Sequence, residues 1–249
     1  MKSLWLSLSC VVLAFALAAC GDDDDMGSGG SGGSGSGSGG ASRTGGSPDG
    51  SGGGDNGDLT FFVSSQTSMS GDLGGLAGAD EICQELAGHV GAASHSFKAY
   101  LSADADPDND EMPVDARDRI GAGPWYNAKG VLVAEDLDAL HARVGDADVF
   151  LDEYGEKIPG QWAGSPTPIE HDILTGSNAD GTLIIGSTCA DWTSASPGLV
   201  AQVGHSDGLG PNASTAGSLS SWNSAHANQS CADTAPRGGS GRIYCFAIN

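Results

Sequence analysis

One pentapeptide of this chain has the spacing of a catalytic nucleophile. Gly204-His205-Ser206-Asp207-Gly208 matches G-x-S-x-G, the turn that carries the serine of many hydrolases. That motif works at a strand-turn-helix corner, with an acid and then a histidine later in the chain. Leu209-Gly210-Pro211 cannot open a regular helix, and His226 precedes the only later acid, Asp233. We therefore expect no catalysis, and a serine hydrolase using Ser206 is the alternative hypothesis.

A second candidate for chemistry is the acidic run Asp104-Ala105-Asp106-Pro107-Asp108-Asn109-Asp110-Glu111. Its alternate aspartates could converge on one calcium ion, which prefers carboxylate oxygens. The run lacks the glycine and the distant bidentate glutamate of an EF-hand loop. We expect a solvated acidic loop and no cofactor. Calcium is the alternative, with these ligands: Asp104, Asp106, Asp108 and Asp110.

The histidines show no spacing that is typical of a metal site. His89, His95, His141 and His171 are scattered along the chain without a metal-spaced pair. Single histidines are usually structural or face solvent, and we interpret these in that way.

The N-terminus has the layout of an export signal. Met1-Lys2-Ser3 is positive, and Leu4 to Leu17 is almost wholly apolar but too short to span a bilayer, which needs roughly 20 apolar residues. Leu17-Ala18-Ala19-Cys20 resembles the lipobox of bacterial lipoproteins, which implies removal of residues 1–19 and attachment of lipid to Cys20. An ordinary secretory signal is the alternative. We expect a membrane-anchored lipoprotein of the bacterial cell envelope, at the outer membrane or cell surface.

Residues 20–57 follow as a lipid-bearing cysteine and a linker of Gly, Ser and Asp that cannot bury a core. A Gly/Ser chain of this length has a root-mean-square reach of roughly 35 Å. Residues 58–249 then have the length of one domain with its own core. Removing the six Asp, one Lys and one Arg before residue 58 from the 32 acids and 10 bases leaves 26 acids and 8 bases, a net charge of −18. That charge argues against nucleic acid as a partner and permits a cationic one.

Four cysteines remain in this domain: Cys83, Cys189, Cys231 and Cys245. An even number in an exported domain predicts two disulfides, and the absence of a C-x-x-C pair disfavours zinc. Three pairings are possible from the sequence alone.

Hydrophobic spacing predicts the elements that must position these residues. Leu76, Ala79, Cys83 and Leu86 fall on one helical face, so a helix over 75–87 places Cys83 in the core. The other predicted elements are strands at 59–63, 97–101, 183–185, 199–203 and 243–248, a hairpin at 125–133, and short helical segments at 114–119 and 137–144. Helices early and loop-rich strands late indicate an α+β domain.

Six segments together resemble the endostatin-like domain of bacterial surface lipoproteins, a group that includes the leptospiral endostatin-like proteins. They are Phe62-Val63-Ser64-Ser65, Gly75-Leu76-Ala77-Gly78-Ala79-Asp80-Glu81-Ile82-Cys83, Phe97-Lys98-Ala99-Tyr100-Leu101-Ser102, Asp118-Arg119-Ile120, Cys189-Ala190-Asp191-Trp192-Thr193 and Ile243-Tyr244-Cys245-Phe246. The resemblance covers essentially all of residues 59–249.

The resemblance implies a variant of the C-type-lectin-like fold with nested disulfides, Cys83 to Cys245 and Cys189 to Cys231. Trp222-Asn223-Ser224 stands where calcium-dependent lectins have Trp-Asn-Asp, so an expected calcium ligand is missing. We expect Trp222 in the core and no calcium-dependent sugar binding. The predicted function is a tethered, non-catalytic binding module for an unidentified protein or glycan, adhesin-like in its role; a purely structural envelope protein is a further alternative.

Overall fold

The structure is a computed structural model that describes residues 59–249. The predicted signal peptide (1–19), the lipid site at Cys20 and the linker (20–57) lie outside the described residues. Within 59–249, no helix has both the length and the apolar character needed to cross a bilayer.

The described chain is a mixed α+β structure, which confirms the predicted class. Its α-helices are α1 (Gly75–His89), α2 (Leu137–His141) and α3 (Cys189–Trp192). Its strands are β1 (Phe61–Val63), β2 (Phe97–Ala99), β3 (Ala103–Asp106), β4 (Met112–Val114), β5 (Trp125–Tyr126), β6 (Leu132–Ala134), β7 (Asp172–Leu174), β8 (Gln202–His205), β9 (His226–Ala227) and β10 (Gly239–Ala247). Short 3₁₀ helices lie at η1 (Pro107–Asn109), η2 (Ala116–Asp118), η3 (Pro211–Ala213) and η4 (Gly217–Ser220).

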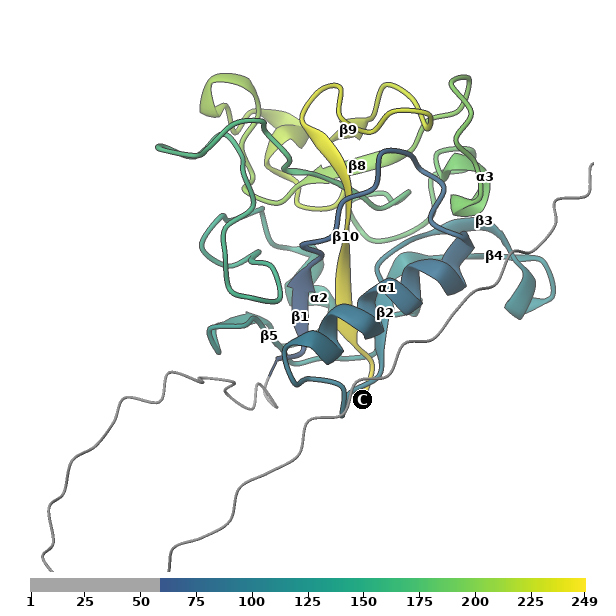
Figure 1. Cartoon of the computed structure of the whole chain (residues 1–249), viewed down its shortest axis with the longest axis horizontal. Coiled ribbons are helices and arrows are strands. Elements are labelled where there is room, and N and C mark those ends of the chain that lie inside the picture. The colour runs from purple at the N-terminus through teal and green to yellow at the C-terminus, as the bar shows by residue number, and fades with distance from the viewer. Residues whose placement is uncertain (1–58) are drawn as a thin grey trace, which may run out of the picture. The chain divides into compact units, whose positions relative to one another are not determined.

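Strand β10 is the centre of the main sheet, whose strand order is β1-β10-β7-β8-β9 with β2 also paired to β10 (Figure 1). The C-terminal half of β10 pairs antiparallel with β1 and β2, and its N-terminal half pairs parallel with β7. The last strand therefore joins the first strand of the domain to the strands of its loop-rich second half.

Both faces of this sheet are buried. Along β10, Ile243 and Cys245 belong to one apolar cluster, which lies under α1, while Tyr244 and Phe246 belong to a second, aromatic cluster. This alternation follows from the two-residue side-chain period of a strand. Burial on both faces explains why residues 243–248 are continuously apolar and were recognisable as a strand in the sequence.

Helix α1 packs across β10 and β2 through the face predicted from its spacing (Figure 1). Leu76, Ala79, Cys83 and Leu86 are buried, and the helix extends two residues beyond the predicted end at residue 87. The predicted hairpin is also confirmed, because β5 and β6 pair antiparallel.

Two disulfides link Cys83 with Cys245 and Cys189 with Cys231, the pairing that the resemblance implied. The first joins α1 to β10, and the second holds the turn of α3 to the segment after β9. Gly71 lies directly against the second bridge, where an added Cβ would approach Cys189 Sγ to 2.3 Å. Glycine is therefore required at this contact.

The turn of α3 is left-handed. Cys189, Ala190, Asp191 and Trp192 have φ values of 51°, 52°, 56° and 64°. Each non-glycine residue in this conformation costs about 1–2 kcal/mol. Buried contacts offset the cost: Cys189 is bridged, Trp192 Nε1 donates to the carbonyl of Ser102 at 2.8 Å, and Asp191 Oδ1 accepts from the backbone N–H of Asp104 at 2.6 Å.

Two predicted strands differ from the structure, and strand β7 was not predicted. Residues 183–185 form no strand, because Leu183 makes only an isolated bridge to Ser177 and Ile185 is exposed. The strand predicted at 199–203 is β8, which begins later and ends at His205. Strand β7 was not predicted, because its three residues, all buried, are too few to show a period.

The lengths of the two disulfide loops predict unequal contributions to stability. The outer bridge closes a separation of 162 residues and the inner one 42. Chain entropy gives about 5 and about 4 kcal/mol respectively. Paired Cys→Ala replacement of Cys83 and Cys245 should lower the free energy of unfolding in urea by about 1 kcal/mol more than replacement of Cys189 and Cys231. A larger loss from the inner pair would mean that release of the α3 turn, not chain entropy, dominates.

Candidate functional site

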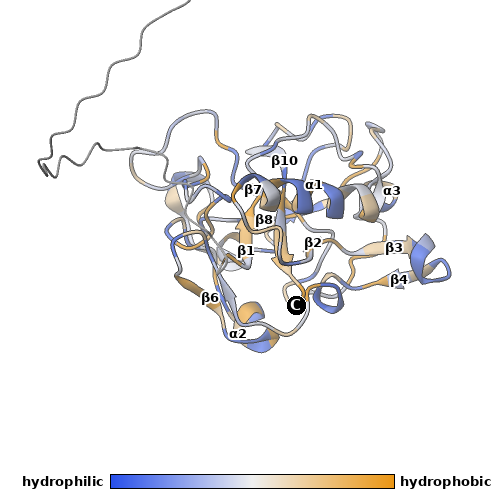
Figure 2. Cartoon of the chain, turned by 60° about the horizontal axis from the view of Figure 1, so that its bottom comes forward, coloured by the Kyte–Doolittle hydropathy of each residue, from blue (hydrophilic) through white to orange (hydrophobic). Residues whose placement is uncertain are grey.

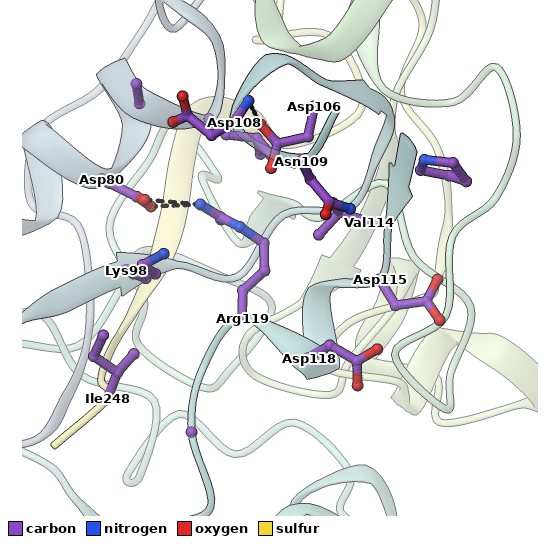
Figure 3. A pocket seen from close by; sticks show the side chains of 14 residues that line it. Asp80, Lys98, Asp106, Asp108, Asn109, Val114, Asp115, Asp118, Arg119 and Ile248 are labelled. Carbon is purple, nitrogen blue, oxygen red and sulfur yellow. Dashed lines mark hydrogen bonds and ion pairs between the residues drawn. The ribbon is translucent and has the colours of Figure 1, made fainter. Parts of the chain in front are cut away.

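The main cavity of the domain is a groove with a volume of about 680 Å³, between α1 and the β3–β4 hairpin (Figure 3). Its floor includes apolar side chains of Leu76, Val114 and Ile248. The charged side chains that line it are five aspartates and two cations: Asp80, Asp106, Asp108, Asp115, Asp118, Lys98 and Arg119. Five negative and two positive charges leave this groove, which we call the acidic groove, with a net charge of −3.

Arg119 is held at the wall of the acidic groove by fixed partners. Its Nη2 donates to both carboxylate oxygens of Asp80, at 2.9 and 2.8 Å, and its Nη1 donates to the carbonyl of Ala99. Asp80 Oδ1 also accepts from the backbone N–H of Ala99 at 2.9 Å. This arrangement ties α1 to β2 and neutralises one of the aspartates, while Asp108 and Asp118 are exposed to solvent.

A second hollow of about 300 Å³ adjoins the first and shares four of its lining residues: Leu76, Ala77, Asp106 and Asp108. It adds the carboxylates of Glu111 and Asp191. Figure 2 shows that the tip of the projecting β3–β4 hairpin is strongly hydrophilic. The two hollows together are lined by carboxylates and by apolar side chains.

The four candidate calcium ligands do not converge on one point. Asp104 accepts from the backbone N–H of Gly186 at 2.9 Å and from Thr188 Oγ1 at 2.8 Å. Asp106 caps η1 by accepting from the N–H of Asp108 at 3.0 Å. Asp108 and Asp110 are exposed. In residues 59–249 the only group of three or more potential ligands whose atoms come together is His171, Asp172 and His205.

Ser206 lies in a turn that does not lead directly into a helix. Strand β8 ends at His205, and the next helical element is η3, which begins at Pro211. The Ser206 side chain is buried, and its Oγ has no hydrogen-bond partner among the described residues. Packing explains the first glycine of the motif, because a Cβ on Gly204 would lie 1.8 Å from the carbonyl oxygen of Trp222. This geometry differs from a nucleophile elbow, in which the serine is exposed at a strand-helix corner.

Three imidazoles lie around one buried carboxylate where β7 begins, β8 ends and β9 begins. Nε2 of His171 lies 3.4 Å from Asp172 Oδ1, Nε2 of His205 lies 3.3 Å from the same oxygen, and Nε2 of His226 lies 3.5 Å from Asp172 Oδ2. The rings of His171 and His205 are stacked, with centroids 4.4 Å apart. We call these four residues the His/Asp cluster.

The contacts to Asp172 are longer than the 2.7–2.9 Å that is usual for a hydrogen bond between charged groups. Both of its oxygens are buried without a hydrogen-bond partner among the described residues. Burial raises the pKa of Asp172 to about 6, although the neighbouring His226 and His171 oppose the shift. Burial and the proximity of His171 lower the pKa of His205 to about 4.

Asp207 is hydrogen-bonded to Nδ1 of His171, whereas Nε2 of the same ring faces Asp172. His171 Nδ1 donates to Asp207 Oδ1 at 2.7 Å, and the N–H groups of Gln161 and Leu209 donate to the same carboxylate. Burial opposes ionisation, but these hydrogen bonds outweigh it and hold the pKa of Asp207 below its usual range. Asp207 thus remains the hydrogen-bond acceptor that orients the His171 ring.

Trp222 and Asn223 are buried structural residues. Trp222 is fully buried in the aromatic cluster, which confirms the prediction that it is a core residue. The Asn223 amide donates to Tyr100 Oη at 2.9 Å and to the carbonyls of Asn178 and Ala179. Its amide nitrogen is therefore engaged in linking the residue 178–179 loop to the core.

Interpretation of the sequence missed the His/Asp cluster. His171 was considered singly, while His205 and His226 entered only through the serine motif. The cluster depends on sheet register: Asp172 pairs with His205, and Val203 pairs with His226. The adjacent His171-Asp172 and His205-Ser206-Asp207 were the only local signal, because β7, which joins them, was not predicted.

No protein-family model matches the chain, and no curated protein matches it.

The unpartnered hydroxyl of Ser206 predicts an unusual stability effect. Ser206→Ala removes a buried polar group that has no partner, so it should raise the free energy of unfolding by about 1 kcal/mol. Ser102→Ala is the matched control, because Ser102 Oγ bonds Ser177 Oγ and accepts from the N–H of Ala116, both at 2.9 Å. It should lower stability by about 1–3 kcal/mol. Urea denaturation measures both; turnover of an ester substrate that disappears in Ser206→Ala would instead establish the hydrolase.

Proposed function

We propose that this chain is a lipid-anchored protein of the bacterial cell envelope, whose folded part is an endostatin-like, non-catalytic binding module. The acidic groove carries the proposal, because the excess of carboxylates that line it favours a cationic ligand. The ligand that fits best is a basic peptide segment of a partner protein.

The endostatin-like assignment rests on the six ordered segments and is supported by the fold in two respects. Cys83 pairs with Cys245, and Cys189 with Cys231, as the resemblance implies. The first and last strands, β1 and β10, are also hydrogen-bonded neighbours, which brings the ends of the domain together. A C-type-lectin-like chain path is the specific fold that we propose on these grounds.

The size and chemistry of the acidic groove support a peptide ligand. A volume of about 680 Å³ lies within the range of roughly 300–1,000 Å³ that is usual for ligand sites. Lysine and arginine side chains combine an apolar stem with a charged end, so the stems can pack on Leu76 and Val114 while the charged ends reach the carboxylates. The adjoining hollow extends the surface for further residues of an extended segment.

The proposed role also uses the predicted anchor and linker. A chain with a root-mean-square reach of roughly 35 Å would let the domain search the volume near the membrane surface. A net charge of −18 beyond residue 57 disfavours adsorption to anionic lipid headgroups. The module would therefore remain available to a partner.

A labelled oligolysine peptide tests the groove. Asp108→Asn combined with Asp118→Asn removes two exposed carboxylates that make no hydrogen bond within residues 59–249. If each contributes about 0.7 kcal/mol, affinity measured by fluorescence anisotropy should fall roughly tenfold. Binding should also weaken as salt is raised, because the contacts are exposed.

The matched control is Glu135→Gln combined with Glu156→Gln, which removes the same charge from exposed residues that do not line the groove. This variant should bind the peptide as the unmodified protein does. Equal losses in the two double variants would show that the peptide responds to overall charge, and absence of any binding would contradict the groove proposal.

Replacement of Cys20 tests the anchor. Cys20→Ser should abolish acylation and shift the exported protein from the membrane fraction to the soluble fraction, since several acyl chains are needed for stable residence. Cys10→Ser, within the predicted signal, should leave anchoring unchanged. Mass spectrometry of the mature N-terminus gives the lipid directly; a Cys20→Ser protein that stays with the membrane would contradict lipid anchoring at this residue.

A further inference from the structure

We propose that His171, Asp172, His205 and His226 bind one divalent transition-metal ion of the zinc class. The proposal goes beyond the binding role of the acidic groove and does not depend on it. It rests on the spacing of the ligand atoms of His171, Asp172 and His205, with His226 beside them, and on the burial of the Asp172 carboxylate, which has no hydrogen-bond partner among the described residues.

The spacing of the ligand atoms fits a tetrahedral ion. Metal–ligand bonds of about 2.0–2.1 Å in a tetrahedron place the ligand atoms about 3.3–3.4 Å apart. The Nε2 atoms of His171 and His205 lie 3.4 and 3.3 Å from Asp172 Oδ1, and all three ligand atoms fall within 4.8 Å of one another. His226 lies outside this group of three, but its Nε2 is 3.0 Å from Nε2 of His205 and 3.5 Å from Asp172 Oδ2, which is why we include it as the fourth ligand in the proposal.

Hydrogen bonds on the far side of each ring place its hydrogen on Nδ1 and leave Nε2 on the side of Asp172. His205 Nδ1 is 2.9 Å from the carbonyl oxygen of Leu219, and His226 Nδ1 is 2.9 Å from that of Ala227. A carbonyl oxygen can only accept, so each Nδ1 carries the hydrogen. His171 Nδ1 likewise donates to Asp207. Each neutral ring therefore has its lone pair on Nε2, the form in which histidine ligates a metal.

A cation is needed where these lone pairs meet. With all three rings neutral, their Nε2 lone pairs and the carboxylate face one another at 3.0–3.5 Å with no hydrogen between them, and either a proton on one Nε2 or a bound metal ion would relieve the repulsion. Asp172 is only 2% exposed, and both of its oxygens lack hydrogen-bond partners in the described chain. A buried carboxylate is costly unless it is paired or coordinates a metal. One ion bonded to all four atoms would compensate every member of the cluster.

The ligand types select the class of metal. Imidazole nitrogens suit zinc and its neighbours in the first transition row, whereas calcium and magnesium require oxygen ligands. Asp172 in the cluster and Asp207 behind His171 supply two negative charges for a divalent ion. The pairing of Asp207 with His171 is the carboxylate–histidine–metal arrangement that is common around zinc.

The burial of the cluster indicates a structural ion. His171 and His205 are 3% and 1% exposed, and only the His226 side chain, at 27%, reaches solvent. With four protein ligands the coordination sphere is closed, as in structural zinc sites. The ion would join β7, β8 and β9 in the part of the domain that is richest in loops, and it would enter past His226.

Zinc titration of the full mature protein in detergent, after removal of metal with a chelator, tests the site. We expect one Zn²⁺ per chain, measured against a competing chromogenic chelator. At free zinc 100-fold above the dissociation constant, the melting temperature should rise by roughly 5–10 °C. Co²⁺ in place of Zn²⁺ should give the intense visible absorption of a tetrahedral ion.

Variants locate the bound ion. Asp172→Asn and His226→Gln should each weaken zinc binding at least tenfold and reduce the thermal shift, whereas His89→Gln, an exposed histidine of α1, should change neither. His226 lies at the exposed side of the cluster, so His226→Gln remains informative if the buried Asp172→Asn variant does not fold. Absence of stoichiometric zinc binding, or equal binding by His226→Gln and His89→Gln, would overturn the proposal. Loss of oligolysine binding in the groove variant with zinc binding intact would separate the two sites.

Discussion

The described domain depends on the burial and pairing of β10. This strand is covered on both faces, is hydrogen-bonded to β1, β2 and β7, and is cross-linked to α1 through Cys245. Arg242 adds a polar attachment, because its guanidinium pairs with Glu170 and donates to the carbonyls of Ser64 and Ser65.

The two halves of the domain are stabilised in different ways. The first half packs α1 on the sheet through apolar side chains at helical spacing. The second half has short strands and many glycines, so fewer apolar contacts are available to offset the cost of ordering its backbone. There the stabilising contacts are specific ones: the Cys189–Cys231 bridge, the buried bonds that hold the left-handed α3 turn, and the His/Asp cluster. A metal in the cluster would extend this pattern, because its bonds do not require a large apolar core.

The two groups of carboxylates differ in their exposure to solvent, and this difference determines which ligands they can bind. In the acidic groove, exposed aspartates such as Asp108 and Asp118 are hydrated and can repel one another at little cost, so they can exchange water for a cationic ligand. Asp172 is buried among imidazoles, where an unpaired negative charge is expensive and its pKa is raised. The same residue type is therefore suited to the reversible binding that we propose in one place and to the fixed cation that we propose in the other.

The sequence alone determined the features that depend on local pattern. The spacing of Leu76, Ala79, Cys83 and Leu86 predicted α1 and its buried face, and the even cysteine count predicted two disulfides. Resemblance to a family, not spacing, supplied the pairing. The acidic groove and the His/Asp cluster became visible only in the tertiary structure. Both bring together residues that lie far apart in the chain, and the cluster requires a register between β7, β8 and β9 that strands of two to four residues do not reveal through hydrophobic periodicity. Long-range register is set by packing of the whole domain around β10, and this is why histidines that appear isolated in the sequence meet at one carboxylate.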